Sequence, residues 1–426
     1  MVDWFVVGGP QKPGSARGRV AGSAYGRVAG SAYGRVVGAA HRRLIGVLLL
    51  VALLVVVACT PGASPPPPPD GLVPAATWEQ RQAAYLKHAT STLNRRSTDS
   101  ILATLARSRS DKGFAVDARE FTPGDLQATF ARVDTNMDTS DFDLMRLWVL
   151  WREYRADLAP ETAAALEQRI LGFRYWYTDP KPANGTDHKW FWSENHRIIS
   201  HTLEYLAGSQ LPDARFVITG APGRTHADRG RTRVTTWLDE KTRWGFSEWH
   251  SDVYYPEDIQ ALLLLSQYAE PAVADRARGL LDILFLDLAV NQVDGNFGVT
   301  HGRSYMKDKS RAADQNTRDI VHFLFDTNPD GYAPWVDFGA LLLATSTGYR
   351  LPATIRGIAT DPGPSLIHQR LGVAIDPGEP IRPDPPAPPG TSFTGPGAVE
   401  FWWDRGAMTA WQVVPASLAA IREQEL

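Results

Sequence analysis

The stretch Lys189–Gly208, KWFWSENHRIISHTLEYLAG, places charged, amide and imidazole side chains in a segment otherwise suited to burial. Apolar and aromatic residues recur at spacings of three and four positions, which predicts an amphipathic helix that ends at Gly208. The residues that carry this pattern are Phe191, Trp192, Ile198, Ile199, Thr202, Leu203, Tyr205 and Leu206. The polar residues Glu194, Asn195 and His196 are therefore expected near the start of a packed helix.

A second polar and aromatic stretch, WGFSEWHSDVYYPED, spans Trp244–Asp258 and runs into the strongly apolar segment Ile259–Tyr268. Both stretches combine side chains capable of chemistry with side chains suited to a core. We therefore expect the rest of the chain to act as a scaffold for these two.

From Thr77 onward the chain shows one helical pattern after another, whereas the alternation typical of strands is scarce. The expected helices are Trp78–Leu93, Asp99–Arg107, Pro123–Val133, Asp141–Leu158, Pro160–Tyr177, Lys189–Gly208, His226–Arg243, Pro256–Ala269, Pro271–Val290, Thr317–Phe325 and Pro334–Thr347. Thr77 and Ser140 are expected to cap helices, and Pro160 is expected to open one. Since the connections are short, successive helices should pack as antiparallel hairpins.

These features predict an all-α domain over residues 77–375. The expected architecture is an α/α toroid, an incomplete barrel of antiparallel helical hairpins. A helical solenoid would give a similar pattern and stays open as an alternative. Two long polar stretches, Tyr177–Lys189 and Asn291–Ala313, interrupt the helices. Long loops of this kind often carry function in a domain with short turns.

The N-terminal region is typical of an exported lipoprotein. Residues 1–58 contain repeated GRVAGSAY segments, then Arg42-Arg43 and the uncharged run Leu44–Ala58, which suits a signal peptide. Cys59, the only cysteine, follows Val-Val-Ala as in a lipobox, so we expect it to be lipidated. An uncleaved anchor helix is the alternative. Residues 59–76 would then form a proline-rich tether, and the body would lie outside the cytoplasm, attached to the membrane.

Charge and residue types exclude several classes of function. The net charge of -3 gives no global basic field, so nucleic acid is not an expected partner. His196 and His201 stand five positions apart, which does not align two imidazoles on one helix face, so neither a metal site nor a cofactor is expected. Residues 376–390 form a second proline-rich linker. The segment 391–426 is too short for a domain and is interpreted as a C-terminal segment that is either complete or truncated.

The two polar stretches match the needs of β-elimination on a uronate-containing sugar chain. Such an enzyme must neutralise the uronate carboxylate, remove the adjacent proton and protonate the departing oxygen. Asn195 and His196 supply an amide and an imidazole for the first task, and Tyr254 supplies a group for both proton transfers. A tyrosine base needs cations nearby because it titrates near pH 10, and His301 or Arg303 would provide one.

This arrangement resembles the alginate-lyase and heparinase-like polysaccharide lyases with an α/α-toroid domain. In that superfamily an Asn-His pair near a helix start is followed by a turn with Gly, Glu and Ser and the catalytic tyrosine. Here Asn195-His196 is followed by the second motif, which consists of Gly245, Glu248, Ser251, Tyr254 and Tyr255. The resemblance implies catalytic roles for Asn195, His196, Tyr254, His301 and Arg303. It also implies substrate contacts from Trp192, Glu194, Glu248, Trp249, Tyr255 and Tyr305.

One departure and several alternatives accompany this interpretation. Such lyases commonly carry a C-terminal β-sandwich domain, for which this chain has no room. The site is then incomplete, the chain is a fragment, or His301 and Tyr305 substitute. Each site residue also has a structural alternative, as a helix cap, a core polar group or a packed aromatic. The predicted partner is an acidic polysaccharide or other glycan. The alternative functions are an inverting glycoside hydrolase that uses Glu194, Glu248 or Asp252, and a non-catalytic glycan-binding surface lipoprotein.

Overall fold

A computed structural model describes residues 76–91, 97–183, 187–327, 331–361 and 366–369, together with residues 414, 418, 421 and 422. The described residues belong to one compact unit, Pro74–Leu426. The signal region, Cys59, all but the last residue of the tether and the linker 376–390 lie outside the described residues, as does most of 391–426. The predictions for those regions therefore stay predictions.

The described part of the chain is built almost entirely of helices, which confirms the all-α prediction. The helices are α2 (Trp78–Ser91), α3 (Thr98–Ser110), η1 (Ala118–Glu120), α4 (Gln127–Asp134), α5 (Ser140–Tyr154), α6 (Pro160–Gly172), α7 (Glu194–Gln210), α8 (Gly223–Trp244), α9 (Tyr255–Tyr268), α10 (Pro271–Asn291), α11 (Met306–Ser310), η2 (Ala312–Asp314), α12 (Arg318–Phe325), α13 (Phe338–Thr345) and α14 (Ala353–Ala359). In the stretch predicted to be irregular, β1 (Gln292–Val293) and β2 (Asn296–Phe297) pair antiparallel. Asp294 and Gly295 turn the chain between them, both with positive φ.

Local sequence signals account for most helix starts. Thr77 Oγ1 accepts a hydrogen bond from the Gln80 N–H at 3.2 Å, and the Gln80 side chain accepts one from the Thr77 N–H at 2.7 Å. This reciprocal capping box begins α2. Pro160 is the first residue of α6, as expected. The prediction for Ser140 was wrong, because Ser140 lies inside α5 and Thr139 precedes the helix without a side-chain cap bond.

Several predicted helix boundaries were also wrong. The helix expected to reach Tyr177 ends at Gly172, because Phe173 is extended and the Arg174 guanidinium binds the carbonyl oxygens of Tyr177 and Asp179. These bonds hold the following aromatic segment as a loop. The helix around Asn195 begins at Glu194 rather than Lys189, because residues 191–193 are not helical and Ser193 forms the N-cap.

Gly208 does not end α7, contrary to the expectation, but allows a close helix contact. A Cβ atom at Gly208 would lie 2.4 Å from the Ala227 nitrogen, and one at Gly230 would lie 2.5 Å from the Tyr205 nitrogen. The two glycines thus let the backbones of α7 and α8 approach each other. Farther along, Arg197 of α7 binds Glu240 of α8, so the two helices run antiparallel.

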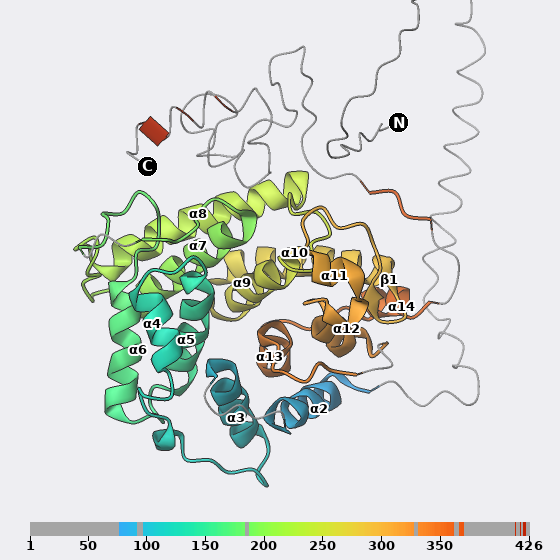
Figure 1. Cartoon of the computed structure of the whole chain (residues 1–426), viewed down its shortest axis with the longest axis horizontal. Helices are drawn as coiled ribbons and strands as arrows, with labels where there is room; N and C mark the ends of the chain where they lie inside the picture. Colours follow the sequence, from blue (N-terminus) through green and yellow to red (C-terminus); the bar gives the residue numbers. More distant parts are fainter. Residues whose placement is uncertain are drawn as a thin grey trace, which may run out of the picture. The chain divides into compact units, whose positions relative to one another are not determined.

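The main helices form a cycle of contacts (Figure 1). Helix α2 packs on α3, α3 on α5, α5 on α7, α7 on α9, α9 on α13, and α13 on α2. The helices α4 and α6 pack on α5 or on each other, α8 packs on α7, and α10 on α9. A toroid requires such a cycle of neighbours, but the toroid itself stays a prediction.

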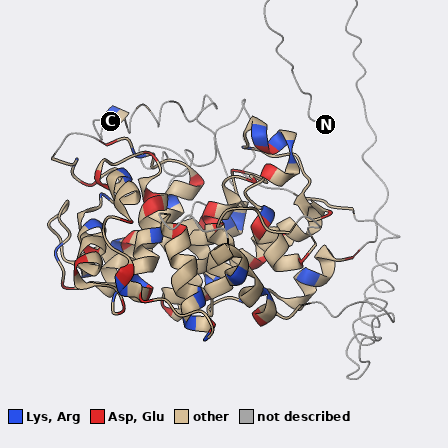
Figure 2. Cartoon of the chain, turned by 60° about the horizontal axis from the view of Figure 1, so that its bottom comes forward, with Lys and Arg blue, Asp and Glu red and all other residues tan. Residues whose placement is uncertain are grey.

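Several helix starts meet at one end of this cycle. His196 at the start of α7 binds Asp141 at the start of α5. The first residue of α7, Glu194, accepts hydrogen bonds from the backbone of Ser247 and Glu248, just before α9. Helix N-termini carry partial positive charge, which favours carboxylates at such an end. Elsewhere, acidic and basic positions are interspersed over the helices (Figure 2).

Candidate functional site

Glu194 fixes the two polar stretches of the sequence against each other. Its carboxylate is fully buried and forms an ion pair with the ammonium group of Lys241. It also accepts hydrogen bonds from the Ser247 N–H at 2.7 Å, the Ser247 hydroxyl at 2.9 Å and the Glu248 N–H at 3.2 Å. A carboxylate surrounded by protein donors is not available to a ligand. Glu194 therefore has a structural role here rather than the substrate contact expected for it.

Five predicted site residues from distant segments form a connected group, which we call the polar cluster. Asn195 Nδ2 donates a hydrogen bond to Glu248 Oε2 at 2.5 Å. The other carboxylate oxygen of Glu248 accepts a hydrogen bond from the Arg303 guanidinium. That guanidinium lies 4.0 Å from the centre of the Tyr254 ring. The Tyr254 hydroxyl is 2.5 Å from the Tyr305 hydroxyl.

The helix geometry leaves Asn195 free for this contact. Ser193 caps α7 by accepting a hydrogen bond from the His196 N–H at 3.3 Å, so neither Asn195 nor His196 serves as the cap through its side chain. Asn195 Oδ1 is buried without a hydrogen-bond partner among the described residues. Buried polar atoms without partners are rare in folded proteins, and each needs an explanation. A ligand group that donates to Oδ1 would provide one.

Burial and neighbouring charges change the acidity of the polar cluster. Burial, together with the nearby Glu194 carboxylate, raises the pKa of Glu248 to about 7, although Arg303 and Asn195 oppose the rise. Burial and the hydrogen bond with Tyr305 raise the pKa of Tyr254 well above its ordinary value, and Arg303 only partly offsets them. The Tyr254 hydroxyl is therefore protonated at neutral pH. Glu248 is present in both protonation states there.

His196 is held beside the cluster by the start of α5. Its Nδ1 lies 2.7 Å from Asp141 Oδ2, and its ring stacks on Phe142 at 4.9 Å. Burial disfavours the charged imidazole, but the Asp141 carboxylate outweighs burial, and the pKa of His196 is raised. Nε2 makes no hydrogen bond to the described residues. His196 can therefore present a proton on that nitrogen.

His301 anchors the loop that carries Arg303 and Tyr305. His301 Nδ1 lies 3.0 Å from Asp252 Oδ1, and the Ser304 hydroxyl donates to the same oxygen at 2.7 Å. Gly302 N–H donates to the Trp249 carbonyl oxygen at 2.7 Å, and a Cβ at Gly302 would lie 2.8 Å from that oxygen. His301 is thus a positioning residue in this structure.

The aromatic candidates divide into buried and accessible residues. Tyr255 is fully buried and donates a hydrogen bond to Asp287 at 3.0 Å, so it belongs to the core and not to the substrate surface expected for it. Trp192 is also buried and packs on Tyr177 at 4.2 Å. Trp249 and Tyr305 are 38% and 50% exposed, so both have faces that a sugar ring can reach.

Sequence reasoning missed two carboxylates that position the site. For Asp141 the sequence predicts only a place at a helix start, and nothing in its neighbourhood indicates that it orients His196 across 55 positions. For Asp252 the sequence suggests only a hydrolase carboxylate, whereas this side chain is buried and holds His301 and Ser304. The motif around Asp252 also contains Glu248, His250 and Ser251, so polar character does not single that residue out.

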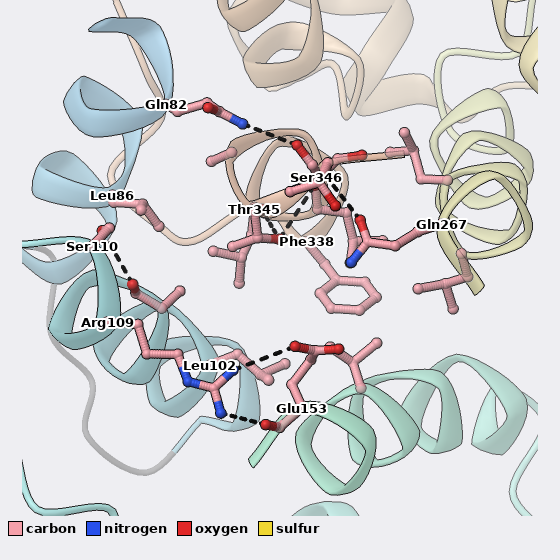
Figure 3. Close-up of a pocket in the computed structure, with 18 of the residues that line it drawn as sticks. Gln82, Leu86, Leu102, Arg109, Ser110, Glu153, Gln267, Phe338, Thr345 and Ser346 are labelled. Atoms are coloured by element: carbon pink, nitrogen blue, oxygen red, sulfur yellow. Dashed lines mark hydrogen bonds and ion pairs between the residues drawn. The ribbon is translucent and has the colours of Figure 1, made fainter. Parts of the chain in front are cut away.

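Among the cavities lined by the described residues, two lie at different ends of the inner helices. One, of about 200 Å³, includes Pro256 and Glu257 at the start of α9, the helix that Tyr254 precedes. The other, of about 260 Å³, lies between the ends of α3, α5, α9 and α13 that are remote from the cluster. Figure 3 shows its polar side chains bonded to the protein, as in the pair Arg109–Glu153. It contains no predicted site residue.

Two further findings apply to the described residues alone. They include no group of three or more His, Cys, Asp or Glu side chains placed to hold a metal ion. Within the same ranges, no helix has the length and apolar character needed to cross a membrane.

Comparison of the chain with protein-family models, with curated proteins and with solved structures finds no match. The resemblance to polysaccharide lyases therefore stays a prediction that depends on the residues and their geometry.

Proposed function

We propose that this chain is a polysaccharide lyase that cleaves a uronic-acid-containing polymer by β-elimination. The observation that supports it best is the polar cluster, in which Asn195, Arg303 and Tyr254 come within reach of one another. Asn195 and Arg303 already converge on one carboxylate, that of Glu248. Donors arranged in this way suit the carboxylate of a uronate. We also propose export and tethering of the chain through Cys59.

In the proposed reaction, Asn195, His196 and Arg303 neutralise the uronate carboxylate. The Tyr254 phenolate takes the proton from the carbon next to that carboxylate. The electron pair released forms a carbon–carbon double bond, while the bond from the adjacent carbon to the glycosidic oxygen breaks. The departing oxygen then takes the proton from Tyr254, so the enzyme returns to its starting state. Glu248 acts as a positioning residue for Asn195 and Arg303.

The acidity of Tyr254 gives Tyr305 a role in this scheme. Because the pKa of Tyr254 is raised, the hydroxyl must lose a proton before it can act as a base. Tyr305 is half-exposed and bonded to that hydroxyl, so it is placed to pass the proton to solvent. The Arg303 guanidinium beside the ring stabilises the phenolate that results.

Product chemistry tests the proposal. The full chain is incubated with alginate, polygalacturonate and unsulfated and sulfated glycosaminoglycans, and the ultraviolet absorbance of the unsaturated uronate is followed. We expect absorbance to rise with at least one polymer. Constant absorbance across the whole panel would exclude elimination on these substrates.

The raised pKa of Glu248 favours one alternative, an inverting glycoside hydrolase. A carboxyl group with a pKa of about 7 suits a general acid. The hydrolase needs a second free carboxylate, and Glu194 and Asp252 are both occupied by protein donors. New reducing ends without ultraviolet absorbance would identify hydrolysis and overturn elimination.

A further inference from the structure

The cavity of about 200 Å³ at the start of α9 has a polar lining drawn from four parts of the fold. Glu257 and Gln260 come from α9, Asp319 from α12, Asp337 from the start of α13, and Trp335 from the loop before it. A cavity of about 150 Å³ holds a benzene ring. The volume therefore suits one sugar ring.

Two residues that line the cavity contact residues of the proposed site, namely Tyr254 and the positioning residue His301. Glu257 follows Tyr254 in the chain, and its N–H donates to the Tyr254 carbonyl oxygen at 3.1 Å. Gln315 also lines the cavity and lies 3.4 Å from His301. A polymer with one ring at the polar cluster can thus place a neighbouring ring in this cavity.

Two buried side chains in the lining each have one oxygen without a hydrogen-bond partner among the described residues. Gln260 is 2% exposed, and its Oε1 has no hydrogen-bond partner among the described residues. Asp319 is also 2% exposed, and although its Oδ1 accepts from the Ala333 N–H at 2.8 Å, its Oδ2 has no such partner. Both oxygens are acceptors, so they suit hydroxyl or amide N–H donors of a ligand.

Trp335 adds an apolar face to this polar lining. It is 50% exposed, although it lines the cavity. A large exposed aromatic ring beside hydrogen-bonding groups is suited to stacking on the face of a sugar ring. The cavity therefore offers both contacts that a pyranose ring requires.

The charges of the lining select against an anionic ring. Glu257, Asp319 and Asp337 contribute three carboxyl groups, and the one guanidinium in the lining, that of Arg146, is already paired with Asp99 at 2.8 Å. Burial raises the pKa of Glu257 to about 7, that of Asp319 to about 6 and that of Asp337 to about 8. The ionised groups of the lining would repel a further carboxylate or sulfate. Such an anion could enter only if a proton were taken up with it.

We infer that this cavity is a subsite for an uncharged hexose or N-acetylhexosamine ring next to the uronate position. The substrate would then alternate uronate with an uncharged sugar, which excludes homopolymers of uronate as preferred substrates. This inference about the polymer rests on the proposed function, whereas binding of an uncharged sugar does not.

Two disaccharide probes test the subsite without any cleavage. Binding of N,N′-diacetylchitobiose and of digalacturonate to the full chain is measured by titration calorimetry at pH 7. Trp335→Ala should weaken the binding of N,N′-diacetylchitobiose about threefold to tenfold, and Gln260→Leu about tenfold. Digalacturonate can bind at the uronate position of the polar cluster, and we expect neither substitution to weaken that binding. Unchanged binding of the uncharged probe by Trp335→Ala would overturn the inference, as would an equal loss of digalacturonate binding.

A matched control comes from the same helix. Gln267 lies in α9 but lines the remote cavity, so Gln267→Leu should leave the binding of both probes unchanged. If Gln260→Leu prevents folding, Trp335→Ala still tests the subsite, because Trp335 is half-exposed and its substitution should leave the fold intact.

Polymer cleavage separates the two proposals. We expect kcat/KM on hyaluronan, in which uronate and N-acetylglucosamine alternate, to exceed that on polygalacturonate or alginate at least tenfold. Faster cleavage of the homopolymers would overturn the inference while supporting elimination. Chitobiose binding without cleavage of any polymer would support the subsite and overturn the proposed function.

Discussion

The Asn195 amide donates a hydrogen bond to the Glu248 carboxylate at 2.5 Å, although the two residues are 53 positions apart. Asn195→Asp would set a second carboxyl group against Glu248 in a buried site. We expect the free energy of unfolding to fall by about 2–4 kcal/mol, and to fall further as the pH rises and both groups ionise. Urea unfolding at pH 5 and pH 8 measures this effect.

A second substitution checks the cause of that loss. Adding Glu248→Gln to Asn195→Asp supplies an amide donor for the new carboxylate, so part of the stability should return. A double variant no more stable than Asn195→Asp alone would contradict the assigned hydrogen bond.

Adjacent tyrosines provide a matched pair for the proposed chemistry. Tyr254→Phe removes the hydroxyl bonded to Tyr305, and we expect kcat to fall by on the order of 10²–10⁴ with little change in stability. Tyr255→Phe removes a buried bond to Asp287 and should cost about 1–2 kcal/mol of stability while leaving kcat nearly unchanged. Kinetics on the cleaved polymer and thermal unfolding are compared for both variants. The reverse pattern would transfer the catalytic role to Tyr255.

Substitutions at Arg303 and Arg311 distinguish a specific role of the Arg303 guanidinium from a general effect of positive charge. Arg303→Lys keeps the charge but loses the planar guanidinium that binds Glu248 and covers Tyr254, so kcat/KM should fall on the order of tenfold to hundredfold. Arg311 is exposed and pairs with Asp314, so Arg311→Lys should have no measurable effect. Equal losses in both variants would indicate that only net charge matters.

Two glycines test the close contact between α7 and α8. Gly230→Ala places a methyl group against the Tyr205 backbone, and we expect a loss of about 3 kcal/mol or more in the free energy of unfolding. Gly279 lies in α10, where an added Cβ meets nothing within 4 Å, so Gly279→Ala should stabilise by about 0.5–1 kcal/mol. Denaturant titration distinguishes the two, and tolerance of Gly230→Ala would be inconsistent with the close approach.

The pH dependence of stability should reflect Asp337. Burial and the nearby Asp319 carboxylate raise the pKa of Asp337 from 3.8 to about 8. The folded chain therefore binds a proton more tightly than the unfolded chain does. The resulting stabilisation is complete below about pH 4 and is lost as the pH rises toward 8.

Asp337→Asn tests this sign. An asparagine can still accept the cap bond that the Ala340 N–H now donates to Asp337 at 2.7 Å, but it does not titrate. Between pH 4 and pH 8 the variant should lose less stability than the parent chain, by an amount on the order of a few kcal/mol. Parallel curves for the two proteins would show that Asp337 is not the group responsible.

Patterns in the sequence predicted the helical class of the body and most helix positions. Apolar spacing located α9 and α10, and Pro160 and Pro271 marked helix starts, because these signals act within a few residues. The sequence also made Asn195, Tyr254 and Arg303 candidates, because amide, phenol and guanidinium groups suit β-elimination and the motifs that carry them resemble those of polysaccharide lyases.

Helix packing, in contrast, sets which candidate residues meet and which have a structural role. Tyr254 and Tyr255 are adjacent residues of the same type. Because α9 begins at Tyr255, the Tyr255 ring packs in the core, whereas the Tyr254 hydroxyl reaches Tyr305. Likewise, Glu194 is occupied by Lys241 and Ser247 of other segments. These pairings span dozens of positions and depend on how helices pack and how far their backbones approach, which the periodicity of a single segment does not encode.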